Sequence, residues 1–188
     1  MSALGGKLTL AMAHIHLEGT LMALRLVAGS VALSLCGCAT MPSTQTASAL
    51  VGTWRLQDRI DRTADGRELV EPSLGRDPLA LLIYDVRGHV AAQLMKRDRS
   101  HLFTAAASGA DPNNSAAQGG YDAYFGTYVV SGNTVTHFLE AALDKKDVGR
   151  RLTRNFRVHG NSLIIYFPAR EPDGTPVTRT LSWQRAAP

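Results

Sequence analysis

The chain from Leu50 onward is divided into short apolar segments by turn signals rich in glycine, asparagine, aspartate and proline. In the first segment apolar and polar residues alternate, which is the period of a β-strand and not of a helix. Eight segments are expected to be strands: 50–56, 79–84, 89–95, 125–130, 134–141, 151–158, 162–167 and 177–185. Most neighbours are joined by tight turns such as Ser131–Asn133 and His159–Asn161. The pattern therefore predicts an all-β domain built as a meander of hairpins.

Evenly spaced hairpins are compatible with a β-sandwich or with a closed barrel. A long meander leaves two exposed strand edges, and only closure of the sheet on itself removes both. We therefore expect an up-and-down antiparallel β-barrel of about eight strands. A barrel of this size is either filled by side chains or holds one small ligand.

One segment, 97–118, does not fit the strand pattern because it is polar and rich in small residues. A loop of about 20 residues in a compact domain is usually functional or disordered. The segment is therefore either a lid over the mouth of the barrel or a surface loop, and the sequence leaves both interpretations open.

An apolar run at 26–35 precedes the strand-rich part and is far shorter than the roughly 20 residues that span a bilayer. It follows Arg25 and ends in Leu35–Cys38. Such a run between a positive residue and small residues is typical of a secretory signal peptide. We expect a signal segment, disordered or helical, over residues 1–37, with Met22 as an alternative start. A buried helix is the other interpretation, but nothing there recurs at helical spacing.

The end of this run resembles the bacterial lipoprotein signal, in which an aliphatic residue and two small or tolerant residues precede an acylated cysteine. The resemblance implies that Cys38 is lipidated and that residues 38–49 form a polar tether. Cys36 is a poorer acceptor because the bulky Leu35 would precede the cleavage point. The residue after Cys38 is Ala39 and not aspartate, and in lipoproteins that the signal resembles, the absence of aspartate there points to the outer membrane. The resemblance therefore implies a periplasm-facing protein of the cell envelope, held at the outer membrane by acyl chains.

Composition restricts what the remaining domain, 50–188, can do. Both cysteines lie before it, so a disulfide, a cysteine–zinc site and a thiol nucleophile are excluded for the domain. The net charge of +4 is small and scattered, which argues against nucleic acid as a partner. The motifs of serine hydrolases, phosphate-binding loops and zinc proteases do not occur. We therefore expect no cofactor and no metal, and no catalytic residue can be named from a motif.

Several blocks of the strand-rich part resemble a known family: 50–56, 77–84, 88–95, 124–128 and 135–137 followed by Glu140. In this order they resemble the bacterial and fungal lipocalin-like domain family over nearly all of 50–185. Gly52 and Trp54 resemble the Gly-x-Trp signature of lipocalins, and this resemblance implies that Arg185 packs over Trp54. The family implies a barrel and suggests ligand binding, but a fold does not settle an activity.

Strand alternation places a polar residue among apolar neighbours on three of the later strands, namely His137, Arg154 and Arg179. A buried charge without a partner is costly, so these groups need partners. One solution is an internal salt-bridge network with the carboxylates of Glu140, Asp144 or Asp147. The other is an anionic or carbonyl-bearing ligand on Arg154, whose planar fork suits a carboxylate, with His137 as a hydrogen-bond partner. Arg179 is the weaker candidate because a frayed strand edge would expose it.

Three tyrosines, Tyr84, Tyr124 and Tyr128, are further candidates for the ligand wall because they combine apolar area with a polar tip. Ordinary core packing is the alternative. Gln93 is added to the set, although the alternation does not decide which face of its strand is inside. The expected ligand is a small hydrophobic molecule that can carry an acidic end.

Two other functions stay open at this stage. The first is a barrel enzyme of isomerase or cyclase type that uses His137 with Tyr84 or Glu140 as acid and base. The second is a structural envelope lipoprotein whose barrel is filled. The sequence makes a binding protein the first choice, because nothing in it indicates a specific reaction.

Overall fold

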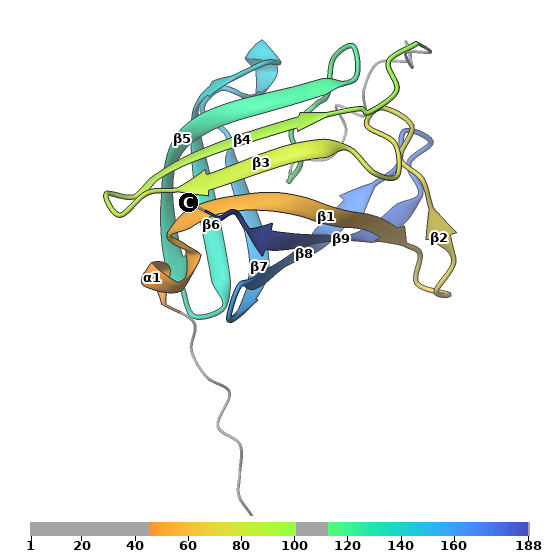
Figure 1. Cartoon of the computed structure of the whole chain (residues 1–188). Helices are drawn as coiled ribbons and strands as arrows, with labels where there is room; N and C mark the ends of the chain where they lie inside the picture. The colour runs from red at the N-terminus through yellow and green to blue at the C-terminus, as the bar shows by residue number, and fades with distance from the viewer. Residues whose placement is uncertain (1–45, 101–112, 188) are drawn as a thin grey trace, which may run out of the picture. The chain divides into compact units, whose positions relative to one another are not determined.

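The computed structural model describes residues 46–100 and 113–187, which form an all-β domain with almost no helix (Figure 1). The predicted signal segment and Cys38 lie outside the described residues. The last part of the predicted tether forms the short helix α1 (Ala47–Leu50), whose Leu50 is fully buried. Among the described residues, no helix is long and apolar enough to cross a membrane.

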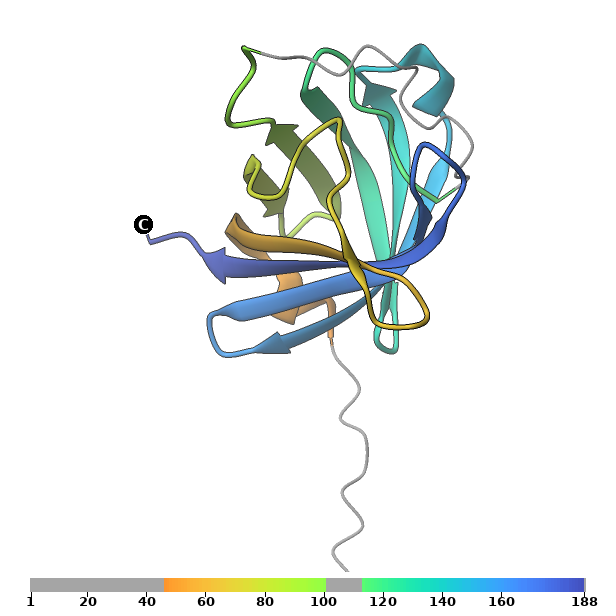
Figure 2. The same cartoon turned by 90° about the vertical axis from the view of Figure 1, so that its right-hand side faces the viewer.

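Eight antiparallel strands build the barrel: β1 (Gly52–Arg62), β3 (Leu79–Tyr84), β4 (His89–Met95), β5 (Tyr121–Ser131), β6 (Thr134–Ala142), β7 (Arg151–His159), β8 (Ser162–Arg170) and β9 (Pro176–Arg185). Each strand pairs with the next, and the pairing of β1 with β9 closes the sheet. Figure 2 shows these two strands side by side. The predicted up-and-down barrel is confirmed, and the sandwich alternative is wrong.

Two smaller elements complete the domain. The two-residue strand β2 (Glu68–Leu69) pairs with the far end of β1. A 3-10 turn, η1 (Lys145–Asp147), connects β6 to β7. Each contributes a buried carboxylate nearby: Glu71 follows β2, and Asp147 ends η1.

The first strand is longer than its apolar pattern suggests. It continues through residues 57–62, which are polar apart from Ile60 and show no strand-like alternation of apolar and polar residues. This part is held by β9, with Asp58–Arg62 opposite Thr178–Ser182 after a bulge between Leu56 and Asp58. The tertiary pairing therefore overrides the weak local preference of these residues.

The stacking of Arg185 on Trp54 that the Gly-x-Trp resemblance implies is present where β1 and β9 pair. The guanidinium of Arg185 lies 4.1 Å from the centre of the fully buried ring of Trp54 and donates to the carbonyls of Val51 and Ala49. Gly52 has a φ of 135°, and a Cβ atom on it would collide with this guanidinium. The backbone conformation thus favours glycine here, and a larger residue would also displace the guanidinium from its place on Trp54.

The described end of the segment 97–118 is fastened to the barrel. The amide of Asn113 exchanges two hydrogen bonds with the backbone of Thr153 on β7, at 2.8 and 2.7 Å. The backbone N–H of Ala116 donates to Asp147 at 2.8 Å. Residues 101–112 lie outside the described residues, so the choice between a lid and a surface loop stays open.

Candidate ligand site

The interior of the barrel contains a cavity of about 60 Å³. Because one water needs roughly 10–15 Å³ of such volume, the cavity has room for a handful of waters or one small organic group. The apolar part of its wall includes Leu82, Leu94, Ile165, Leu181 and Trp183. The polar part includes Arg59, Glu71, Asp122, Tyr124, His137, Arg154 and Arg179. Most of the barrel is therefore filled by side chains, and the remaining space has both apolar and charged walls.

His137 on β6 is at the centre of the polar part and is almost completely buried, as its inward orientation predicts. The hydroxyl of Tyr84 lies 2.7 Å from its Nε2 atom, and that of Tyr124 lies 3.0 Å from its Nδ1 atom. Burial, together with the charge of Arg154, lowers the pKa of His137 to about 3, so the imidazole is neutral at ordinary pH.

The neutral imidazole determines what Tyr124 can offer to a ligand. A neutral histidine has one donor and one acceptor nitrogen, so one tyrosine donates to His137 and the other accepts from it. Tyr124 lines the cavity, whereas Tyr84 does not. In either tautomer the hydroxyl of Tyr124 keeps hydrogen-bonding capacity that His137 does not use. Burial raises the pKa of Tyr124 to about 12, so this hydroxyl stays protonated.

Three of the predicted ligand residues do not reach the cavity. Tyr84 lies behind His137, and Tyr128 packs edge-on against Tyr84 at 4.8 Å and donates to the carbonyl of Asp85. Gln93 is a correction, because its exposed side chain lies on the outside of β4 and accepts a hydrogen bond from Tyr121. The neighbours of Gln93, Ala92 and Leu94, face the interior and line the cavity.

Arg154 on β7 points into the barrel, as the strand alternation predicts, and is 4% exposed. Its Nη1 atom donates to the backbone carbonyl of Asn113, to the side-chain oxygen of Asn113 at 2.8 Å and to the carbonyl of Thr153. Its guanidinium also lies 3.7 Å from the ring centre of Phe167. These contacts hold the arginine against the cavity wall through neutral acceptors and an aromatic face.

The carboxylates predicted as partners of the inward arginines are placed elsewhere. Glu140 is exposed, and the half-buried Asp144 accepts a hydrogen bond from the backbone N–H of Lys146. Asp147 is buried, but it forms an ion pair with Arg150 and accepts from Ala116. The proposed acid–base pair of His137 with Glu140 is therefore not assembled, because the two side chains lie on opposite faces of β6.

Asp122 is a functional candidate that the sequence analysis missed. Its buried carboxyl lines the cavity and accepts a hydrogen bond of 2.6 Å from the hydroxyl of Ser115. Burial is the main reason that the pKa of Asp122 rises to about 6, and the charge of Asp147 adds to it. The expected strand starts at Phe125. Had it been extended toward the N-terminus, the period-2 spacing of Asp122 and Tyr124 would have placed both side chains on the same face.

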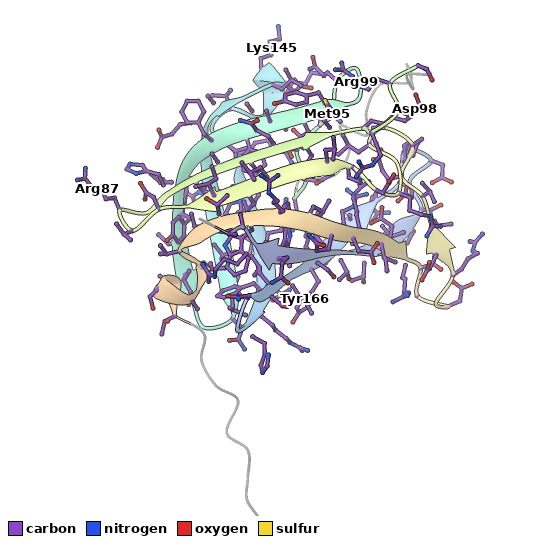
Figure 3. The ribbon with its side chains drawn as sticks, in the orientation of Figure 1. Arg87, Met95, Asp98, Arg99, Lys145 and Tyr166 are labelled. Carbon is purple, nitrogen blue, oxygen red and sulfur yellow. The ribbon has the colours of Figure 1, made fainter. Side chains whose placement is uncertain are left out.

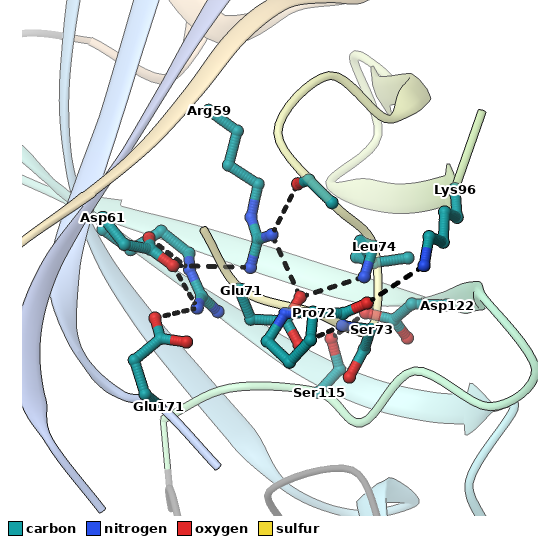
Figure 4. Close-up of polar contacts among 12 residues, drawn as sticks. Arg59, Asp61, Glu71, Pro72, Ser73, Leu74, Lys96, Ser115, Asp122 and Glu171 are labelled. Atoms are coloured by element: carbon teal, nitrogen blue, oxygen red, sulfur yellow. Dashed lines mark hydrogen bonds and ion pairs between the residues drawn. The ribbon is translucent and has the colours of Figure 1, made fainter. Parts of the chain in front are cut away.

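A second polar cluster, which we call the ion-pair cluster, consists of Arg59, Asp61, Glu71, Glu171 and Arg179, all buried. Arg179 on β9 donates from Nε and Nη2 to the two oxygens of Asp61 on β1, at 2.8 and 2.7 Å. Arg59 pairs with Glu71 at 3.0 Å and approaches Asp61 at 3.8 Å (Figure 4). The internal salt-bridge network is therefore present, with acidic partners other than those predicted.

The expected exposure of Arg179 is wrong: the residue is only 3% exposed. Its strand is not frayed at this point, because β9 pairs there with both β1 and β8. The pKa of Glu171 is raised to about 7, mainly by burial and next by a hydrogen bond with Asp61. The cluster thus packs two guanidinium groups against three carboxyl groups of unequal acidity.

Comparison with known proteins identifies the domain. A protein-family model described as a lipocalin-like domain matches residues 51–186. An uncharacterized protein from Bacteroides eggerthii aligns at 11% identity over 73% of this chain and 99% of its own, with a TM-score of 0.40. Insecticyanin from the tobacco hornworm Manduca sexta aligns at 11% identity over 77% of this chain and 65% of its own, with a TM-score of 0.41. A search of curated proteins found no match.

Proposed function

Because this chain belongs to the lipocalin-like domain family, we propose that its barrel binds a small molecule with an apolar body and an acidic or carbonyl end. The observation that carries the proposal is the cavity, which brings an apolar wall together with the guanidinium of Arg154 and the hydroxyl of Tyr124. A lipocalin-like barrel suggests small-molecule binding, and these two side chains favour an oxygen acceptor on the ligand.

The chemistry of the polar wall supports this ligand class. A carboxylate or carbonyl oxygen beside Arg154 would accept a charge-assisted hydrogen bond, which is stronger than one between neutral groups. The hydroxyl of Tyr124 supplies a second contact of the same kind. Asp122 opposes an anion only above a pH of about 6, where its carboxyl ionises. With about 60 Å³ available, a carboxylic acid of a few carbon atoms fits without rearrangement of the barrel.

The test is a titration of the protein with butyrate, monitored by NMR, with butyramide and butylamine as matched neutral and cationic probes. We expect saturable shifts around Tyr124 and His137 with butyrate, weaker ones with butyramide and none with butylamine. Arg154→Met should weaken butyrate binding at least tenfold, the loss of one charge-assisted hydrogen bond. Arg157→Met is the control, because Arg157 lies on the same strand and is exposed.

Two results would contradict the proposal. One is a barrel that responds to none of the three probes and shows no co-purified molecule in native mass spectra, which would favour the filled structural barrel. The other is equal binding of butyrate and butylamine, which would remove Arg154 from its assigned role.

We propose further that the domain is held at the outer membrane, facing the periplasm, by acyl chains on Cys38. The resemblance of Leu35–Cys38 to the lipoprotein signal supports this proposal. Residues 38–46 would separate the acylated cysteine from α1 and can span at most about 30 Å. Metabolic labelling with an alkyne fatty acid should mark the wild-type chain and Cys36→Ser, and should leave Cys38→Ser unmarked. Equal labelling of both variants would contradict the assignment.

A further inference from the structure

The wall of the barrel is incomplete between β1 and β3. These strands pair only from Gly52–Arg55 to Leu81–Tyr84. Beyond that point β1 continues along β9, after its bulge, while β3 continues along β4 back to Leu79. Figure 1 shows the two strands moving apart toward the right-hand side of the view. Because of this divergence, Leu56 on β1 and Ala80 on β3, whose side chains face inward, are not paired with each other.

A hollow of about 560 Å³ lies at this divergence, and we call it the β1–β3 groove. This volume falls within the roughly 300–1,000 Å³ of pockets that hold drug-sized ligands, unlike the interior cavity. Six apolar residues contribute to its lining: Leu56, Pro78, Leu79, Ala80, Leu81 and Met95. The groove is therefore a larger and more apolar space than the one inside the barrel.

The groove opens on an outer face that is unusually apolar for a strand surface in contact with water. Leu79 and Ile83 alternate with inward residues of β3 and are 45% and 37% exposed. Phe125 on β5, aligned with Ile83 through Ala91, is 56% exposed. The outward positions of an antiparallel sheet are ordinarily polar, so a contiguous apolar face of this kind marks a binding surface.

Positive charge lies at the rim of the groove. Arg55 is exposed, and among the described residues it forms no ion pair with a carboxylate. Arg97, at the rim as well, pairs with the exposed Asp77 at 2.9 Å. An exposed ion pair of this type is weak and easily exchanged for a ligand anion. The groove thus combines an apolar floor with a cation that has no competing partner in the described structure.

We propose that the β1–β3 groove binds a single-chain amphiphile, with its apolar chain along Leu79, Leu81 and Met95 and its anionic head group on Arg55. The shape and the charge of the groove both point to this class. A chain one strand wide fits the space left by the missing β1–β3 pairing, and a head group of negative charge complements the rim. The groove shares no lining residue with the interior cavity, so it does not depend on a ligand there.

The test uses the purified full chain carrying Cys38→Ser, so that no acyl chain is attached, and monomeric laurate as the probe. Dodecyltrimethylammonium has the same chain with a positive head group and is the matched control ligand. Calorimetry should give one laurate per chain and at least tenfold weaker binding of the cationic probe. Amide shifts in NMR spectra should cluster on β1, β3 and the end of β4.

Four substitutions locate the site. Arg55→Gln and Leu79→Gln should each weaken laurate binding at least tenfold. Arg87→Gln and Ile164→Gln are the controls, since both residues are exposed and neither lines the groove or lies on its apolar face. Arg87 lies at the tip of the β3–β4 hairpin, far from Met95 at the other end of β4 (Figure 3). Neither control should change the affinity.

Three outcomes would overturn the proposal. Laurate shifts at His137 and Tyr124 that disappear in Arg154→Met would place the chain inside the barrel. Flotation of the protein with anionic vesicles, without binding of monomeric laurate, would make the apolar face a membrane-docking surface. The absence of any binding to laurate would leave the groove without its assigned ligand, whatever butyrate does in the interior.

Discussion

Arg154 and Arg179 are both inward-facing arginines on neighbouring parts of one barrel, yet the structure holds them in different ways. Arg179 belongs to the ion-pair cluster and makes two parallel hydrogen bonds to Asp61. Arg154 donates to the carbonyl oxygens of Asn113 and Thr153 and stacks on Phe167. A buried arginine therefore does not by itself indicate a ligand site, because the same inward position serves an ion-pair cluster in one strand and the wall of the cavity in another.

The largest expected effect comes from breaking the ion-pair cluster. Asp61→Asn removes the charge that faces both Arg59 and Arg179, and loss of one member of a buried pair typically costs about 3–5 kcal/mol. The free energy of unfolding of the variant, measured by urea denaturation, should be lower than that of the wild type by this amount. Asp77→Asn, which breaks the exposed pair with Arg97, should cost less than about 1 kcal/mol. Similar costs for the two variants would mean that the buried pairs of the cluster matter no more to stability than an exposed ion pair.

The two regions should also respond to pH in opposite directions. Burial acts to raise the pKa of Asp61, but the hydrogen bonds and charge of Arg179 outweigh it and lower that pKa. Its contribution to stability is therefore present above the unfolded pKa and is lost as the pH falls. Burial raises the pKa of Asp122 to about 6, well above its unfolded value. Its contribution is present at low pH and is lost as the pH rises from about 4 to about 6.

This second prediction is measured as a difference between two proteins. Two pH units correspond to about 3 kcal/mol, so the free energy of unfolding of wild type relative to Asp122→Asn should fall by up to that amount between pH 4 and 7. The subtraction removes the titration of Glu171 and His137, which both proteins share. A difference that stays constant with pH would show that Asp122 is already ionised in the folded protein.

The sequence predicts the barrel and the inward faces well because both depend on local pattern. Hairpin turns and strand alternation determine where His137 and Arg154 point, and each can be read within one strand. The pairing of Asp61 with Arg179 depends on residues 118 positions apart, which meet only when β1 and β9 close the barrel. Asp122 was missed because the expected strand starts at Phe125, whereas β5 starts at Tyr121. Gln93 lies outside the interior cavity and instead lines the β1–β3 groove; both faces of β4 carry apolar residues, so alternation alone did not decide where it points.

Substitution of Arg154 should have an intermediate effect on stability. Arg154→Met removes hydrogen bonds to uncharged oxygens of Asn113 and Thr153, each of which typically contributes about 1.5–3 kcal/mol when the donor is charged. Uncharged acceptors left behind cost less than a buried charge without its partner, so the cost should be smaller than that of Arg179→Met, which leaves the carboxylate of Asp61 buried without its main partner. Thermal unfolding of the two variants gives the comparison directly. A larger cost for Arg154→Met would show that Arg154 mainly stabilises the fold, which would weaken the case for an interior ligand.

The smallest effect should come from the tyrosines around His137, and it separates support from ligand contact. Tyr84→Phe removes a buried hydrogen bond to a neutral imidazole and should cost about 1 kcal/mol. It should leave butyrate binding unchanged, because Tyr84 does not line the cavity. Tyr124→Phe should have a similar cost but should also weaken butyrate binding several-fold, since its hydroxyl faces both His137 and the cavity. If the two variants bind butyrate equally well, Tyr124 does not contact the ligand. The arrangement of Tyr84, His137 and Tyr124 then contributes to packing alone.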